Sequence, residues 1–387
     1  MDRPALRRVL LDLTGTASAY QIPALTQADW AELDRIAAQH RLQPLLHSQH
    51  RENSRVPSEI QAGWQAAHRV ATMQAMVQQA ELAETCAVLE RAGFAPVALK
   101  GAWLAAQAYP EAAQRQMRDL DLLIEVAAVV PAFDLLRAAG YTQARPSEMP
   151  LEDVVRIDKH LPPLIAPRGT VIELHHRLWE RDGRLDHASP TSGEAAVRQR
   201  AGLFAGIRYP APQDLLVHLI VHAVYSHRLD CGPLVLADID FLVRAAPIDW
   251  PRFWAEAEAE GWRDGARLLL ELVQRYRPGA MMELPGDPPP PVLIEAAADL
   301  LLQDLDSRAS AGFAAATLKS GPARFAARIA GRQQVSGEVS VRRDMATEGG
   351  FLGWAGSRLI RSIGDLARRD VRRQARQLSA LSTWLDR

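Results

Sequence analysis

Two stretches decide the fold: Pro96-Val-Ala-Leu-Lys-Gly-Ala-Trp-Leu-Ala105 and, a little further on, Arg115-Gln-Met-Arg-Asp-Leu-Asp-Leu-Leu-Ile124. The apolar run before Lys100 favours a short buried strand, and the residues after it favour a helix that ends at Tyr109-Pro110. The second stretch begins its strand with alternating polar and apolar residues. The pattern therefore predicts strand, helix, strand.

Two acidic residues of the second stretch, Asp119 and Asp121, predict a cation site. Side chains at i and i+2 of a strand point the same way, so both carboxylates share one face while Leu120 and Leu122 face the core. Adjacent carboxylates repel unless a cation lies between them, and Mg²⁺ takes one or two carboxylates and completes its shell with phosphates and water. A solvated strand end with two incidental acids is the alternative interpretation.

The Lys100-Gly101 pair stands where the first strand passes into its helix. Glycine lets a phosphate approach the backbone, and a helix N-terminus offers free N–H groups. Only Lys100, Lys159 and Lys319 are lysines among 45 basic residues, which makes an ammonium at this turn a weak indication of a special site. An ordinary turn remains the alternative.

A third acid, Glu173, lies in a strand candidate at Thr170–Leu174. The turn residues Pro167-Arg-Gly169 predict that this strand forms a hairpin with His160–Ala166. Three carboxylates from neighbouring strands suit a two-metal site for phosphoryl or nucleotidyl transfer. His175 shares the face of Glu173, where it contacts nucleotide or acceptor or is merely structural.

Taken together, these residues resemble the uncharacterised bacterial nucleotidyltransferase family of the DNA polymerase β-like superfamily. In that family a Leu-Lys-Gly turn is followed by Tyr-Pro, an arginine, an Asp-x-Asp-Leu-Leu strand and an acidic-x-His strand. The matches occur here in that order, at Lys100-Gly101, Tyr109-Pro110, Arg115, Asp119-Leu-Asp121 and Glu173-Leu-His175. His222 and Leu236-Ala-Asp238 resemble the family's helical half, and the resemblance covers about residues 75–265.

The resemblance implies an α+β fold: a polymerase β-like nucleotidyltransferase core, a small mixed sheet with helices, embedded between N-terminal and C-terminal helical regions. It implies Mg²⁺-dependent transfer of a nucleoside monophosphate from an NTP such as ATP to a hydroxyl or phosphate of an acceptor, with release of pyrophosphate. The implied catalytic and metal residues are Asp119, Asp121 and Glu173, with two metal ions possible. The implied nucleotide contacts are Lys100, Gly101, Arg115, Arg118 and His175. This chain departs from the broader superfamily at one point: the superfamily has Gly-Ser or Gly-Gly at the turn where this sequence has Lys100-Gly101.

Other functions stay open. A catalytically silent nucleotide-binding or accessory protein would keep the fold, and metal-dependent glycosyltransferases also use Asp-x-Asp to bind a metal–diphosphate sugar. The Lys100-Gly101 turn and Glu173 argue against the glycosyltransferase. The residues do not distinguish a small molecule, a sugar, a peptide or tRNA as acceptor.

Two further clusters compete for the metal site. His218 and His222 are one helical turn apart, a spacing that can hold zinc, but no glutamate follows His218 and Cys231 is the only thiol near them. Buried, hydrogen-bonded histidines are therefore favoured, although one could reach the cleft. Asp238 and Asp240 form a second Asp-x-Asp without a preceding glycine turn, which favours a structural or helix-capping role.

The length of 387 residues predicts two or three domains. Changes in the residue pattern along the chain predict four regions. They are an N-terminal helical region at 1–92, the nucleotidyltransferase α/β core at 93–180, a helical domain at 181–306 and a basic tail with a terminal helix at 307–387. No stretch has the length and apolarity of a transmembrane segment or a secretory signal, and two cysteines make no disulfide framework. We expect a cytoplasmic protein.

The tail differs from the rest of the chain in charge. It holds 15 Lys/Arg and 6 Asp/Glu, a net of +9, so the first 306 residues carry −10 of the total of −1. Its final helix, at about Trp354–Leu385, is expected to dock on the acidic body or on an acidic partner. Anionic lipid and nucleic acid are the other candidates.

Overall fold

The computed structural model describes residues 1–15, 21–144, 146–147, 149–179, 193–280, 282–303 and 369–386. These residues form two compact units. One consists of Met1–His227 with Cys231–Pro288, and the other of Arg228–Asp230 with Pro289–Arg387. Most of the basic tail predicted at 307–387, including the first part of its expected terminal helix, lies outside the described residues.

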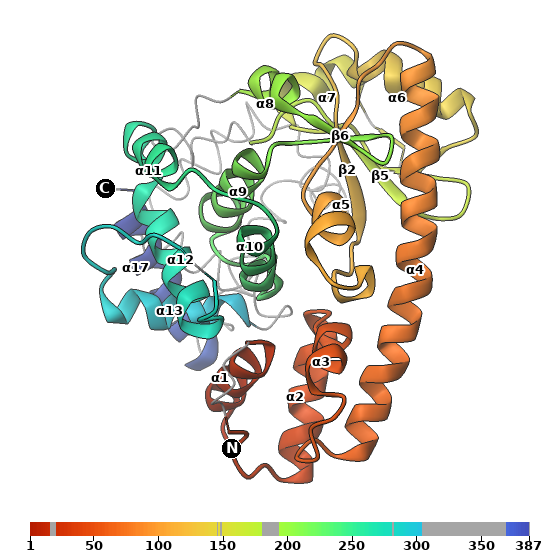
Figure 1. Cartoon of the computed structure of the whole chain (residues 1–387). Helices are drawn as coiled ribbons and strands as arrows, with labels where there is room; N and C mark the ends of the chain where they lie inside the picture. Colours follow the sequence, from red (N-terminus) through yellow and green to blue (C-terminus); the bar gives the residue numbers. More distant parts are fainter. Residues whose placement is uncertain are drawn as a thin grey trace, which may run out of the picture. The chain divides into compact units, whose positions relative to one another are not determined.

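Four helices open the first unit: α1 (Arg3–Thr14), α2 (Gln27–Gln39), α3 (Gln43–His50) and α4 (Ser58–Arg91). A capping box begins α2, because the Thr26 hydroxyl accepts from the backbone N–H of Asp29 and the Asp29 carboxylate accepts from the backbone N–H of Thr26. The long helix α4 runs from α2 and α3 up to the sheet (Figure 1). Its Trp64 donates to Asp34 of α2 over 2.8 Å, which anchors its first turns.

Seven strands form one mixed sheet in the order β3-β4-β5-β2-β1-β7-β6. They are β1 (Val97–Ala98), β2 (Asp119–Leu123), β3 (Thr142–Gln143), β4 (Leu164–Ile165), β5 (Val171–His175), β6 (Gly202–Phe204) and β7 (Ile207–Tyr209). The pairs β2–β5 and β1–β7 are parallel, and the other neighbours are antiparallel. This sheet with its flanking helices confirms the expected α+β fold, and the β4–β5 pair confirms the predicted hairpin.

The strands β6 and β7 correct the helical interpretation of the chain after Glu180. Each has three residues, too few for alternation to register in the sequence. They hold together by pairing with each other around the turn at Ala205-Gly206, and β7 pairs with β1 through Val97 and Arg208. The sheet therefore extends on the β1 side beyond the expected core.

The remaining helices of the first unit surround this sheet or follow it. Beside the strands lie α5 (Gly101–Trp103), the π-helix η1 (Leu104–Ala108), the 3₁₀-helix η2 (Ala112–Gln114), α6 (Val129–Ala138), α7 (Leu151–Ile157) and α8 (Glu194–Arg200). The helical half consists of α9 (Pro212–Val221), the π-helix η3 (His222–Ser226), α10 (Leu234–Ala245), α11 (Trp250–Ala259) and α12 (Arg263–Tyr276). The helix predicted after Lys100 is thus one α-helical turn that continues as a π-helix, closed by a 3.0 Å bond from the Tyr109 N–H to the Leu104 carbonyl.

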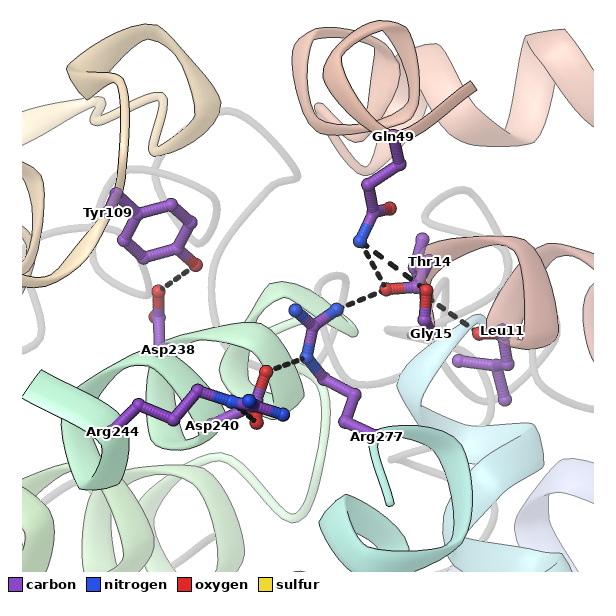
Figure 2. Close-up of polar contacts among 9 residues, drawn as sticks. All are labelled: Leu11, Thr14, Gly15, Gln49, Tyr109, Asp238, Asp240, Arg244 and Arg277. Atoms are coloured by element: carbon purple, nitrogen blue, oxygen red, sulfur yellow. Dashed lines mark hydrogen bonds and ion pairs between the residues drawn. The ribbon is translucent and has the colours of Figure 1, made fainter. Parts of the chain in front are cut away.

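The second Asp-x-Asp lies in α10, and ion pairs take up both of its carboxylates. Residues two apart on a helix face different directions, so Asp238 and Asp240 have different partners. Asp240 pairs with Arg244 over 2.6 Å and with Arg277 over 2.7 Å, and Arg277 also donates to the Thr14 carbonyl at the end of α1 (Figure 2). The structural interpretation of this motif is therefore confirmed.

The second unit contains α13 (Pro291–Leu301) and α17 (Arg369–Leu385), which pack on each other. Val371, Ala375 and Leu381 of α17 are buried, and Gln377 donates to Asp299 of α13 over 2.7 Å. Arg372, Arg373 and Arg376 are exposed on the opposite face. Docking of this basic face on an acidic surface stays a prediction. Within the described residues, every helix falls short of the length and apolarity that a membrane span needs.

Candidate functional site

Asp119, Asp121 and Glu173 lie on one face of two neighbouring strands. The parallel register of β2 and β5 pairs Asp121 with Glu173, and paired residues of neighbouring strands point to the same side. Leu120 and Leu122, which alternate with the aspartates, are buried in the core as predicted. The register therefore brings the three carboxylates together. Their catalytic roles remain predictions.

A buried glutamate of α4 holds the start of β5 in place. The two carboxylate oxygens of Glu81 accept the backbone N–H groups of Arg168 over 2.5 Å and of Thr170 over 3.0 Å. Both donors belong to the turn between β4 and β5, and Glu81 is fully buried. The hairpin that carries Glu173 is therefore fastened to the long helix.

Asp121 is the centre of the site, and each of its oxygens faces a different cation or donor. Oδ1 accepts from Nε2 of His175 over 2.9 Å, and Oδ2 lies 3.0 Å from Nζ of Lys100. Burial raises the pKa of the Asp121 carboxyl, but Lys100 and His175 outweigh it and hold that pKa well below the usual range. Asp121 is therefore ionised and compensated.

Asp119 is in the opposite situation. Burial, and then the like charges of Asp121 and Glu173, raise the pKa of Asp119 to about 6. Lys100 and the exposed Arg118 pull this pKa down by less. The cluster therefore carries uncompensated negative charge at Asp119, which is where a cation would gain most.

Glu173 shares His175 with Asp121. Its Oε2 lies 3.3 Å from Nε2 of His175 and 3.7 Å from Nε2 of His160. Burial raises the pKa of Glu173, but the hydrogen bond from His175 and the nearby His160 leave that pKa below its usual value. Burial lowers the pKa of His175, and the carboxylates, Asp121 first, more than restore it.

The donor atoms of Asp121, Glu173 and His175 can serve one cation. They all lie within 4.8 Å of one another. The separations of 2.9 and 3.3 Å from Nε2 of His175 to the two carboxylates are those of neighbouring ligands, which lie about 3 Å apart when metal–ligand bonds are about 2.1 Å. The residues present therefore fit a divalent cation.

The Lys100-Gly101 turn aims the lysine at the carboxylates. Lys100 has a φ of 45° and a ψ of −114°, a conformation that L-residues rarely adopt. The neighbouring glycine serves close packing, because a Cβ at Gly101 would lie 2.9 Å from Cγ and Sδ of Met117. Phosphate binding at this turn stays a prediction.

Arg115 is held from the helical half. Its Nε lies 2.7 Å from Oδ1 of Asp238, and the Tyr109 hydroxyl donates to the same carboxylate over 2.7 Å. Figure 2 shows Tyr109 reaching toward Asp238 of α10. Burial raises the pKa of Asp238, and Arg115 is the largest influence in the other direction. The phosphate contact of Arg115 stays a prediction, and its guanidinium is already paired with Asp238 on one side.

Two residues near the site were not among the expected site residues, His160 and His218. His160 forms a bridge with His175. The predicted hairpin brings it near the end of β5, because counting back from Ile165–Val171 sets His160 opposite His176, one residue past its observed partner. His218 is buried, and its Nε2 has no hydrogen-bond partner among the described residues, unlike the hydrogen-bonded histidine expected. Burial and then the charge of Lys100 hold the pKa of His218 well below its usual value. No sequence pattern indicates that the charge of Lys100 acts on His218.

Comparison with known proteins gives one match. A family model described as an uncharacterised nucleotidyltransferase matches residues 26–278, which include the whole sheet and the helices α9–α12. No curated protein and no solved structure matches the chain.

Proposed function

The chain belongs to the uncharacterised nucleotidyltransferase family, and from that membership we propose that it transfers a nucleoside monophosphate from an NTP to an acceptor with the help of Mg²⁺. The observation that carries this proposal is the cluster of Asp119, Asp121 and Glu173 with Lys100 beside it. Three carboxylates held within one site are unfavourable unless cations join them, and the reaction brings both Mg²⁺ and a triphosphate.

The carboxylates are proposed to hold the cations. Asp121 stands between Asp119 on its own strand and Glu173 on the next, so it is the residue that two cations would share. Bound there, Mg²⁺ would polarise the α-phosphate and offset the charge that develops on the attacking and leaving oxygens.

The other site residues are proposed to orient the nucleotide. Lys100, Gly101 and Arg115 would contact the triphosphate, with the exposed Arg118 at its outer edge. His175 is proposed to contact the nucleotide from the β5 side. These groups supply the positioning on which phosphoryl transfer depends.

The chemical step follows from this placement. The acceptor's hydroxyl or phosphate oxygen forms a bond to the α-phosphorus, and the bond from that phosphorus to the bridging oxygen breaks. Pyrophosphate leaves with the electron pair. When the acceptor is a hydroxyl, Glu173 is proposed to take its proton.

The test uses the purified full chain with each α-³²P-labelled NTP, Mg²⁺ and a cell lysate as the source of acceptor. We expect a labelled acceptor with wild type, and at least a hundredfold less label with Glu173→Gln. Glu125→Gln is the matched control, because Glu125 is an exposed acid just past β2 that pairs with Arg198. The labelled species, whether small molecule, sugar, peptide or tRNA, identifies the acceptor class.

Other outcomes would replace the proposal. NTP binding without transfer from any nucleotide, unchanged by Asp119→Ala with Asp121→Ala, would favour a silent nucleotide-binding protein. Transfer of the sugar from a labelled nucleotide-sugar, with none from α-³²P NTPs, would favour a glycosyltransferase.

A further inference from the structure

His160 has the orientation of a metal-binding histidine. Its Nδ1 lies 2.9 Å from the carbonyl oxygen of Leu161. A carbonyl oxygen only accepts, so Nδ1 carries a ring hydrogen and Nε2 is the ring nitrogen that faces Glu173. Histidines that bind metals are typically fixed in this way, with the second ring nitrogen donating to a backbone carbonyl or a carboxylate.

Nε2 of His160 faces a carboxylate. It lies 3.7 Å from Oε2 of Glu173, which is too long for a hydrogen bond. Two ligands bound to one cation at about 2.1 Å each lie about 3–4 Å apart, so this separation suits two atoms that share a cation. The ring of His160 also lies against that of His175, with centroids 5.0 Å apart, so two imidazoles border the same carboxylates.

We propose that Asp121, Glu173 and His175 form a nitrogen-containing position for a first-row transition cation, separate from the all-oxygen position between Asp119 and Asp121, and that His160, which contacts Glu173 from outside this group, turns its Nε2 onto the cation when the cation binds. Mg²⁺ prefers oxygen ligands alone, whereas imidazole suits transition cations. The hydrogen that Nε2 of His175 now donates to Asp121 is released to solvent when the cation takes its place.

This inference deepens the proposed function by naming the class of cation at one of its positions. It rests on that function only for what the cation does, because the ligand set of Asp121, Glu173 and His175 comes from measured separations. A mixed centre follows, in which the oxygen position takes the Mg²⁺ that accompanies the nucleotide.

The test is pulsed electron paramagnetic resonance of the metal-free full chain with one equivalent of Mn²⁺. We expect ¹⁴N modulation from directly bound imidazole, which changes to the ¹⁵N pattern when the histidines are ¹⁵N-labelled. The modulation should be shallower in His160→Gln and absent in His160→Gln with His175→Gln. The Mn²⁺ dissociation constant should rise at least tenfold in His175→Gln.

His176→Gln is the matched control, because His176 is also buried and adjoins His175 but, unlike His160, makes no ion pair or ring contact with Glu173 or His175 among the described residues. It should keep both the modulation and the affinity. If His175→Gln does not fold, His160→Gln alone decides, since His160 is only partly buried and its shallower signal is sufficient.

Three results would overturn the inference: failure of Mn²⁺ to bind, bound Mn²⁺ without ¹⁴N modulation, or modulation that survives in the double variant. These are distinguishable from failure of the proposed function. Nitrogen-bound Mn²⁺ without nucleotidyl transfer would remove only the function, and transfer with Mn²⁺ bound by oxygen alone would remove only this inference.

Discussion

At the scale of single residues, two aspartates of one strand have opposite electrostatic environments. Lys100 and His175 compensate Asp121, while Asp119 faces the charges of Asp121 and Glu173. Environments that push two neighbouring pKa values apart are typical of functional sites, because they assign different tasks to the same chemical group. Here Asp121 is compensated before any cation binds, whereas Asp119 is the carboxylate whose repulsion an added cation would relieve.

The first prediction follows from Asp119. Its folded pKa of about 6 lies above the ordinary 3.8, so the folded protein binds more protons than the unfolded chain between these values. The free energy of unfolding therefore falls as pH rises through this window, and the full penalty is present above pH 6. Asp119→Asn should raise the stability of the metal-free protein at pH 7 by about 1–2 kcal/mol.

Urea unfolding at pH 7 and at pH 4 measures this effect. At pH 4 the gain should shrink, because the folded wild type is then protonated at Asp119. Glu125→Gln, at an exposed acid, should change stability by less than about 0.5 kcal/mol at either pH. An equal gain for Asp119→Asn at both pH values would contradict the electrostatic explanation.

The second prediction concerns Lys100, whose Nζ is 3.0 Å from Asp121 on a mostly buried side chain. Lys100→Arg keeps the charge but replaces a compact ammonium by a wider planar fork. We expect the variant to fold and the kcat/KM of nucleotidyl transfer to fall at least tenfold, about 1.4 kcal/mol of lost transition-state stabilisation. Wild-type activity would mean that the lysine is incidental.

At the scale of elements, local patterns predicted the strands that carry the acids. Alternation placed Asp119 and Asp121 on one face of β2, and the turn at 167–169 predicted the hairpin that ends in β5. The parallel pairing of β2 with β5 was not visible in either pattern, because strand order depends on the whole sheet. The sequence also did not predict the short strands β6 and β7. Pairing with neighbouring strands stabilises them more than the β-propensity of their own residues does.

The third prediction tests the turn between β1 and α5. A Cβ at Gly101 would lie 2.9 Å from Met117, so Gly101→Ala should cost about 1–2 kcal/mol in urea unfolding. Met117→Ala removes the colliding atoms. In that background the added methyl should cost less than about 0.5 kcal/mol, and the difference is the coupling of the two residues. If Gly101→Ala costs as much in the Met117→Ala background as in wild type, the destabilisation comes from the backbone and not from contact with Met117.

At the scale of the whole first unit, buried ion pairs join segments that are distant in sequence. Arg115 meets Asp238, and Arg277 meets both Asp240 and the end of α1. The sequence favoured a structural role for the Asp238–Asp240 motif, but no sequence pattern indicated that Arg115 and Arg277 are its partners. Pairings across more than a hundred residues are decided by packing, and local periodicity carries no information about them.

The fourth prediction concerns this ion-pair network. Arg277 and Asp240 are each 1% exposed and pair over 2.7 Å. Removing one partner of a buried pair leaves the other charge poorly compensated, so Arg277→Met should cost about 3 kcal/mol in urea unfolding. Arg252→Met, which breaks an exposed pair with Glu256, should cost less than about 0.5 kcal/mol.

A double-mutant cycle completes the test. Asp240→Asn with Arg277→Met should cost less than the two single changes added together, because no buried charge is then stranded. Additive costs would show that the two side chains contribute independently.

The π-helix η1 and the strand β2 differ in the changes of chain length that they tolerate. An insertion within a strand turns every later side chain to the other face, so one residue added between Asp119 and Asp121 would place their carboxylates on opposite faces of the sheet. Loss of one residue from 104–108 would instead shorten the ring closed by the Leu104 carbonyl and the Tyr109 N–H to that of an ordinary α-turn. Related chains should therefore differ in length at 104–108 and keep the spacing from Arg115 to Asp121 constant.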